Sequence, residues 1–174
     1  SRKKILWLCS WYPNKLEPFN GDFVQRQAHA AALLNDIYVI HLAGDDSGIV
    51  KKTEEVATIA TGISEKIIYF KKKSSLPGKI LSYYKWLLLS KKAIREFIKE
   101  NGKPDIVHVN IPVKAGLVGL WIKRKYGVPY VVTEHWGIYN DVEVHNYERK
   151  NSFFKQLTKK VLAGADVFIS VSRY

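Results

Sequence analysis

The sequence predicts an α/β fold: a doubly wound, mainly parallel sheet with helices on both faces, of the Rossmann-like kind. Short apolar runs rich in β-branched residues alternate with segments of helical periodicity along the whole chain. The runs are continuous rather than interrupted by polar residues, which is typical of strands buried on both faces of a sheet. Because parallel strands joined by helices cross over with a right hand, a doubly wound topology is favoured.

Length and composition limit the class of protein. The 174 residues are enough for one domain with its own core. The hydrophobic share of 47% and the charged share of 25% exclude wholesale disorder. Cys9 is the one cysteine, which excludes a disulfide scaffold, and we expect it to be a buried, unreactive thiol. No apolar run approaches the ~18 residues of a membrane-spanning helix.

The first strand is predicted at residues 5–9, and a loop rich in Trp, Pro and Asn follows it. A helix is predicted over residues 22–35. Asp22 with Gln25 three positions later fits a capping box, so we expect Asp22 to be the N-cap. The expected buried positions of this helix are Phe23, Ala30, Leu33 and Leu34.

The next elements are predicted to be strands. Residues 37–42 indicate a second strand, and the turn-rich sequence at 44–48 is expected to end it. Residues 55–60 and 65–70 indicate two strands around a Thr-Gly pair, which predicts a hairpin or a tight return.

The rest of the chain alternates helices and strands. After a basic loop at residues 71–73, a long helix is predicted over residues 81–99, between Pro77-Gly78 and Gly102. Strands are predicted at residues 105–109, 130–133 and 166–171, and helices at residues 113–126 and 152–162.

The residues that follow the strands form the candidate site, because ligands of open α/β sheets bind beyond the carboxyl ends of the strands. Polar and aromatic residues gather at these positions, as a sugar-binding cleft needs. From them we take as candidate substrate-binding residues Asn110, Glu134, Trp136 and Ser172. The other strand-end residues are Ser10, Trp11, Tyr12, Pro112, Gly137 and Arg173.

Signals for phosphate and metal sites are sparse. The sequence has no G-x-x-x-x-G-K-[ST], no G-x-G-x-x-G after the first strand, no structural zinc spacing and no H-E-x-x-H. We therefore expect neither a P-loop nucleotidase nor a dinucleotide enzyme, and we predict no metal site. Gly21 precedes a predicted helix start, where a glycine lets a phosphate approach the helix N-terminus. Loop geometry alone explains a glycine there equally well.

His135 is the sharpest single candidate for catalysis. Histidine titrates near neutrality and exchanges protons with hydroxyl groups, and His135 follows a predicted strand. A structural histidine is the alternative. Adjacent side chains on a strand point to opposite faces, so we expect only one of Glu134 and His135 to face the cleft. We interpret His108 as a core histidine, and we assign surface or packing roles to the others, His29, His41 and His145.

The basic surplus suggests a charged partner. The chain has 28 Lys+Arg against 16 Asp+Glu, a net charge of +12. Residues 71–92 combine lysines with Tyr and Trp, which suits an anionic membrane surface. A scaffold helix with solvated lysines is the alternative. Since no recognised nucleic-acid module pattern is present, we expect no nucleic-acid partner.

Four segments resemble the sequence patterns of bacterial family 4 glycosyltransferases. Residues 18–28 (PFNGDFVQRQA) resemble the P-x-x-G-x-F-V-x-R-Q-A opening of that family, and residues 104–110 (PDIVHVN) its P-D-I-[VI]-H-x-[HN] strand. Residues 127–135 (GVPYVVTEH) resemble its G-[VI]-P-x-V-x-T-x-H segment, and residues 165–172 (ADVFISVS) its A-D-x-[VI]-x-x-V-S segment. Each pattern is loose alone, but the four occur in the family's order over nearly the whole chain.

The resemblance implies one half of a GT-B enzyme, in which two Rossmann-like domains face each other across a cleft. Residues 1–174 would be the N-terminal, acceptor-side domain. The C-terminal domain, which holds the nucleotide-sugar donor and carries the family's E-x7-E motif, is absent from this chain. We therefore expect the chain to be a segment of a longer protein, inactive when isolated.

The reaction implied by the resemblance moves a hexose from a nucleotide sugar to a glycan or lipid-linked acceptor, in the synthesis of a bacterial surface polysaccharide or glycolipid. It retains the anomeric configuration by front-face displacement and needs no metal or other cofactor. Relatives with lipid-linked acceptors dock through a basic, aromatic surface. We therefore expect a cytoplasmic protein, peripheral at the inner face of the cell membrane through residues 71–92.

By position in the family patterns, Gly21 matches the glycine that lies against the donor's pyrophosphate. His135 matches the histidine near the reaction centre, which makes it the expected catalytic residue. Trp136 and Asn110 match no fixed role. The alternatives are a GT-B transferase of different stereochemistry and a stand-alone basic Rossmann-like binding module. The transferase interpretation requires the first and fifth strands to end side by side, so that Gly21 and His135 share one rim.

Overall fold

A computed structural model of the chain describes residues 1–135 and 147–171. Five strand-end or histidine positions considered above lie outside the described residues: Trp136, Gly137, His145, Ser172 and Arg173.

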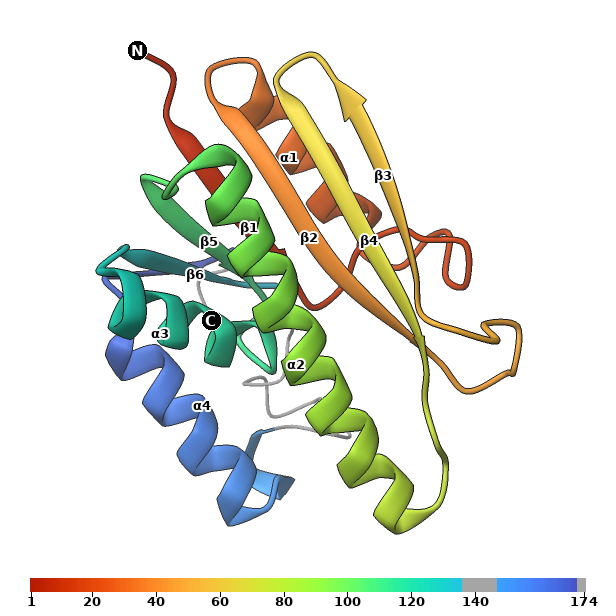
Figure 1. Cartoon of the computed structure of the whole chain (residues 1–174). Helices are drawn as coiled ribbons and strands as arrows, with labels where there is room; N and C mark the ends of the chain where they lie inside the picture. Colours follow the sequence, from red (N-terminus) through yellow and green to blue (C-terminus); the bar gives the residue numbers. More distant parts are fainter. Residues whose placement is uncertain (136–146, 172–174) are drawn as a thin grey trace.

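The described strands form one seven-stranded sheet in the order β3-β4-β2-β1-β5-β6-β7 (Figure 1). Every pair of neighbouring strands is parallel except β3 and β4, which form an antiparallel hairpin. The predicted mainly parallel sheet and hairpin are thus confirmed. The strands are β1 (Lys4–Cys9), β2 (Asp36–Asp45), β3 (Glu54–Ala60), β4 (Ile63–Lys71), β5 (Ile106–Asn110), β6 (Tyr130–Glu134) and β7 (Val167–Ser170).

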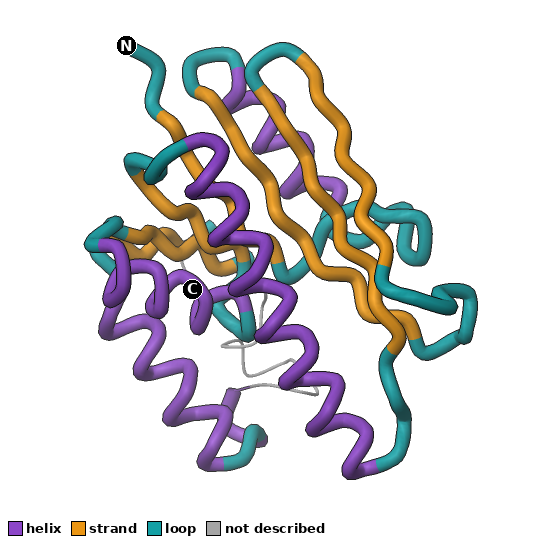
Figure 2. Tube along the Cα trace, viewed as in Figure 1, coloured by secondary structure: helices purple, strands orange, loops and turns teal. Residues whose placement is uncertain are grey.

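Helices cover both faces of the sheet, as predicted. In Figures 1 and 2, α1 lies behind the layer of strands, and α2, α3 and α4 lie in front of it. Within the described part of the chain, no helix has both the length and the apolar character needed to cross a bilayer. The helices are α1 (Asp22–Ala32), α2 (Leu76–Asn101), α3 (Ala115–Tyr126) and α4 (Ser152–Gly164), with a short 3-10 turn at Tyr147–Arg149.

Two hydrophobic cores fill the space between the layers. The core beneath α2, α3 and α4 includes Leu8, Ile94 and Ile122. The core beneath α1 includes Trp7 and Val24, together with Cys9, which is buried as expected. Successive residues of a strand enter opposite cores because their side chains alternate across the sheet.

The start and the buried face of α1 differ from the prediction. Gly21, not Asp22, is the N-cap, and Asp22 instead forms an ion pair with Arg26 at 3.3 Å. Leu33 and Leu34, expected in the core, are each 78% exposed because the helix ends before them. Ala30 is also exposed, and Phe23 is only half-buried. The buried residues are Val24, Ala28 and Ala32, whose spacing of four and small size let the helix lie close to the sheet.

The helix α2 begins five residues earlier than predicted, at Leu76 rather than at residue 81. Ser75 is its N-cap, and the hydroxyl accepts a hydrogen bond from the Gly78 N–H. Pro77 is tolerated in the first turn because the N–H that it lacks would have no partner within the helix. A Pro-Gly pair that we expected to precede the helix therefore lies inside it.

The strands β1 and β2 end at different heights. Cys9, the last residue of β1, pairs with His41 on one side and with Asn110 on the other. β2 continues to Asp45, which pairs with Lys71 of β4, so residues 44 and 45 belong to the strand and not to the predicted turn. Residues 42–45 of β2 therefore have no neighbouring strand on the β1 side, and a step forms at the carboxyl edge of the sheet.

Gly21 joins β1 to α1 by a close backbone approach. Its φ is 74°, and a Cβ atom added there would lie 2.6 Å from the carbonyl carbon of Trp11. Gly127 has a similar φ of 72°, but apart from its own chain neighbours no described residue has an atom within 4 Å of the corresponding position. Both glycines therefore need a left-handed backbone conformation, but only Gly21 has backbone atoms where a Cβ atom would lie.

We expect Gly127→Ala to lower the free energy of unfolding by about 1–2 kcal/mol, the cost of a left-handed conformation. Gly21→Ala should cost about 1–3 kcal/mol more, because the added methyl group meets backbone atoms that cannot move aside. Urea denaturation of both variants measures the difference. Equal losses would show that the close approach at Gly21 does not constrain the fold.

Candidate functional site

The carboxyl ends of β1, β5 and β6 meet at one rim. The Ser10 N–H donates to the Asn110 carbonyl at 3.2 Å, and the Ile111 N–H donates to the Thr133 carbonyl at 2.9 Å. These bonds extend the pairing of the three strands by one residue. The expected juxtaposition of the first and fifth strands is therefore confirmed.

His135 lies at this rim, partly buried. The His135 Nε2 atom is 3.2 Å from Asn110 Oδ1, and the imidazole centroid is 4.9 Å from that of Phe23. Phe23 is the second residue of α1 and follows Gly21 by two positions, so Gly21 and His135 share one rim as required. Because an amide oxygen only accepts hydrogen bonds, Nε2 carries the proton and Nδ1 is the basic nitrogen. Burial lowers the pKa of His135, which keeps the ring neutral at pH 7.

The Asn110 side chain accepts a hydrogen bond from the His135 imidazole. Its side chain is fully buried, and its Nδ2 atom lies 4.0 Å from Cys9 Sγ, which leaves Oδ1 facing His135. Burial also raises the pKa of the Cys9 thiol, so the sulfur stays protonated and unreactive. Direct substrate binding by Asn110 stays a prediction. In the structure its contact is with His135.

Glu134 and His135 occupy opposite faces of the sheet, as expected for adjacent residues. Glu134 continues the row of Tyr130 and Val132, whose side chains belong to the core beneath α3. It is buried, with 5% of its surface exposed. His135 shares the other face with Asn110. Substrate binding by Glu134 stays a prediction.

His108 is a core histidine, as the sequence predicted. Its Nε2 atom is 2.7 Å from Thr133 Oγ1, and its ring packs edge-on against Trp7 at 4.4 Å between centroids. Burial first, and then the nearby charge of His135, lower the pKa of His108 to about 4. His108 therefore supports the rim without titrating near neutrality.

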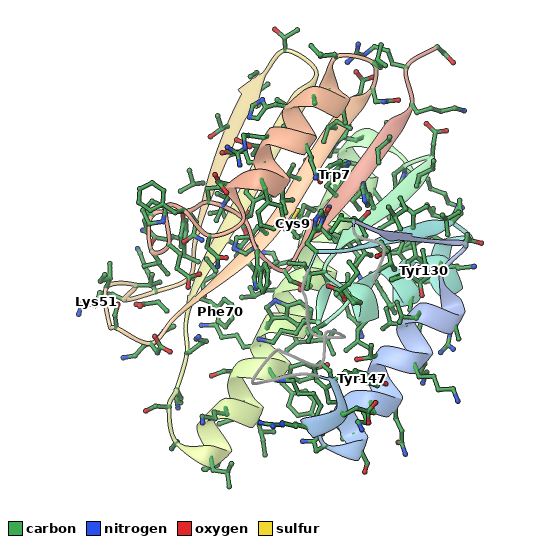
Figure 3. The ribbon with its side chains drawn as sticks, turned by 180° about the vertical axis from the view of Figure 1, so that it is seen from behind. Trp7, Cys9, Lys51, Phe70, Tyr130 and Tyr147 are labelled. Carbon is green, nitrogen blue, oxygen red and sulfur yellow. The ribbon has the colours of Figure 1, made fainter. Side chains whose placement is uncertain are left out.

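A cleft of about 600 Å³ opens beside the rim, in the step between the ends of β1 and β2. Its lining includes Cys9 and Ser10 at the end of β1 and Phe70 near the end of β4; Cys9 and Phe70 are labelled in Figure 3. Several lining residues were not selected as site residues from the sequence, among them His41, Lys72, Trp86 and Lys114. Lys72 belongs to the basic loop at residues 71–73, whereas Lys114 carried no distinguishing signal among the 28 basic residues of the chain.

The turn after β5 borders this cleft and holds an uncommon backbone conformation. Ile111 and Lys114 have φ values of 67° and 65°, which side-chain-bearing residues rarely adopt. The Ser10 hydroxyl lies 2.6 Å from the Val113 carbonyl and 3.0 Å from that of Ile111, and it holds the turn against β1. Such strain persists where surrounding contacts enforce it, and it concentrates at binding sites.

Known proteins resemble the chain in sequence and in structure. The sequence profile of Glycosyltransferase Family 4 matches residues 23–174. The chain is 26% identical over 179 residues to TuaC of Bacillus subtilis (strain 168), named as a teichuronic acid biosynthesis glycosyltransferase. That alignment covers 97% of this chain and 44% of TuaC. Sucrose-phosphate synthase from Thermosynechococcus elongatus has a similar fold, with a TM-score of 0.61 and 13% identity, over 95% of this chain and 42% of that protein. The chain thus spans less than half the length of either relative.

The lowered pKa of His108 predicts that the folded protein loses stability in acid. A base whose pKa is lower in the folded state binds more protons when unfolded, so stability falls as the pH drops below the unfolded pKa. For His108 this window runs from pH 6.5 to about 4. The loss amounts to about 3 kcal/mol when the pH reaches the lower limit.

We expect His108→Gln to reduce this acid loss, because glutamine can still donate to Thr133 but does not titrate. Urea denaturation at a series of pH values measures the effect, with the exposed His29→Gln as the control that keeps the loss. An unchanged pH profile in His108→Gln would contradict the assignment.

Proposed function

Since this chain belongs to glycosyltransferase family 4, we propose that it is the N-terminal, acceptor-side domain of a GT-B glycosyltransferase. In this proposal the complete enzyme moves a hexose from a nucleotide-sugar donor to a glycan or lipid-linked acceptor. The donor binds mainly to a C-terminal domain that faces the rim of this one. The observation that carries the proposal is the position of His135, beside the start of α1 at the carboxyl edge of a doubly wound sheet.

The proposed role of His135 is to contact the reacting hydroxyl or the transferred sugar. Its Nδ1 atom, the ring nitrogen that does not face Asn110, is the one suited to accept a hydrogen bond from a hydroxyl. Because the ring is neutral at pH 7, it can accept a proton without first losing one. Asn110 acts as a positioning residue that sets the tautomer of the imidazole.

The proposed role of Gly21 is to let the donor's pyrophosphate approach the N-terminus of α1. A glycine N-cap brings no side chain into the path of an anion, and the helix dipole favours negative charge there. The close approach to Trp11 gives this glycine a structural reason as well. Both reasons require the same residue.

The proposed class of product is supported by the name of the relative. TuaC is named for teichuronic acid biosynthesis, and we propose a related role for this protein in a bacterial surface polysaccharide or glycolipid. Retention of configuration, front-face displacement and independence of metal ions stay predictions of the family resemblance.

We also propose that α2 contacts the inner face of the cell membrane. Leu76, Ile80, Tyr84 and Leu88 repeat every four residues along one side of the helix, and each is more than half exposed. Lys73 and Lys79 flank this apolar stripe and are exposed. In Figure 1 the first half of α2 projects beyond the carboxyl edge of the sheet, the edge that carries the rim. A lipid-linked acceptor in a membrane touching this stripe would thus approach His135.

His135→Ala in the full-length transferase should lower kcat by about 100-fold or more, with little change in the KM for the donor. His29→Ala, on the exposed side of α1, is the control with full activity. A steady-state assay with varied donor separates the two parameters. Normal turnover in His135→Ala would remove this residue from the reaction.

The chain should bind vesicles of anionic phospholipid, and binding should weaken as salt screens the lysines. Replacing Ile80, Tyr84 and Leu88 with Ser should reduce binding by about tenfold or more, since losing the burial of even one such apolar side chain costs about 1.5 kcal/mol, a factor of about ten. The control replaces Leu33 and Leu34, apolar residues that are exposed just after the end of α1. Vesicle sedimentation measures both. Equal binding by the two variants would show that the exposed stripe of α2 does not contact the membrane.

A further inference from the structure

The cleft beside the rim contains charges that the proposed reaction does not use. Among its carboxylates, Asp45 accepts hydrogen bonds from the Ser47 hydroxyl and from the backbone N–H groups of Ser47 and Val50. Asp46 forms an ion pair with Lys72 at 3.4 Å. Glu17 accepts a hydrogen bond from Asn20 at 2.9 Å. Each acidic side chain of the lining therefore has a partner within the chain.

Lys114 differs from the other charged groups of the lining. In the described ranges 1–135 and 147–171, no carboxylate lies within 4 Å of its ammonium group. The side chain of Lys114 is exposed at the mouth of the cleft, and partial desolvation, followed by the charge of Lys72, lowers its pKa. A cation in this position is stabilised by any anion that enters the cleft. The strained turn held by Ser10 keeps the residue there.

His41, which lines the cleft, has a buried ring nitrogen with no hydrogen-bond donor among the described residues. His41 is 3% exposed, and its Nδ1 atom lies 2.9 Å from the Cys9 carbonyl, to which it donates. Nε2 is therefore an acceptor, and no described residue donates to it. Burial lowers the pKa of His41, so the ring stays neutral. A buried acceptor of this kind is stabilised by a hydroxyl donor from a ligand.

Two indole rings complete the lining. Trp11 follows β1, and Trp86 lies on α2, where it stacks on Tyr83 with 6.0 Å between centroids. Flat aromatic surfaces with a few polar groups are typical of sites for small polar ligands. A ring with hydroxyl groups and one negative charge matches the cation, the acceptor and the indoles together.

We propose that this cleft binds an acidic sugar unit of the acceptor, with its carboxylate or phosphate on Lys114 and its ring beside Trp11 and Trp86. His41 accepts a hydrogen bond from a hydroxyl of the same unit. Ser10 lines the cleft, and its N–H donates a hydrogen bond to the Asn110 carbonyl. Because the Asn110 side chain contacts His135, the bound sugar lies next to the rim. The identification of this sugar as the acceptor rests on the proposed function, whereas its acidic character rests on the cleft alone.

The test is direct binding to the chain, followed by NMR, with four probes: glucuronic acid, glucose 1-phosphate, glucose and inorganic phosphate. At least one acidic sugar should bind about tenfold more tightly than glucose, because a charge-assisted hydrogen bond is added. A preference for glucuronic acid would identify a carboxylate ligand, and a preference for glucose 1-phosphate a phosphate ligand. Inorganic phosphate binding as tightly as the better sugar would overturn the proposal, since the ring would then contribute nothing.

Lys114→Gln should reduce the affinity for the acidic sugar to that for glucose. Lys125→Gln, which removes the same charge at the other end of α3, should leave it unchanged. Lys114→Gly is the second variant; it removes the ammonium group and relieves the positive φ, so its unfolding midpoint should not fall. Equal affinity in wild type and Lys114→Gly would overturn the proposal. Because no transfer is measured, the outcome is independent of the activity of His135→Ala.

Discussion

The arrangement of the site depends on one backbone contact, the approach of Gly21 to the peptide that follows β1. A residue with a Cβ atom cannot approach Trp11 so closely, and the left-handed φ turns the chain directly into α1. The helix then lies on the sheet through Val24, Ala28 and Ala32 and brings Phe23 against His135. Backbone geometry at Gly21 thus helps to assemble the rim, and His135 packs against Phe23 in the first turn of α1.

A difference in strand length supplies the second part of the site. β1 stops opposite His41, while β2 and β4 continue to Asp45 and Lys71, and the cleft occupies the resulting step. The bond from Ser10 to Asn110 joins the cleft to the rim. The exposed stripe of α2 extends past the same edge of the sheet. One edge therefore combines the histidine, a polar pocket and an exposed apolar stripe.

The order of strands and helices was predictable because continuous apolar runs and helical periodicity are local features. The buried face of α1 was not predictable. Helical periodicity assigned Leu33 and Leu34 to the core, but the helix ends at Ala32 and both side chains are exposed. The position of His135 after a strand was readable from the sequence. The burial of Asn110 behind it was not, because that depends on Cys9, which is distant in the sequence and reaches it only through the pairing of β1 with β5.

The sequence by itself determined the parallel α/β class, the family, and the placing of His135 and Gly21 next to a strand end and a helix start. Each of these follows from residue types within a few positions of one another. Only the tertiary structure decided that the two residues share a rim, that Asn110 sets the tautomer of the imidazole, and that Lys114 and His41 border one cleft. These contacts join residues far apart along the chain, and strand register, which no local pattern specifies, brings them together.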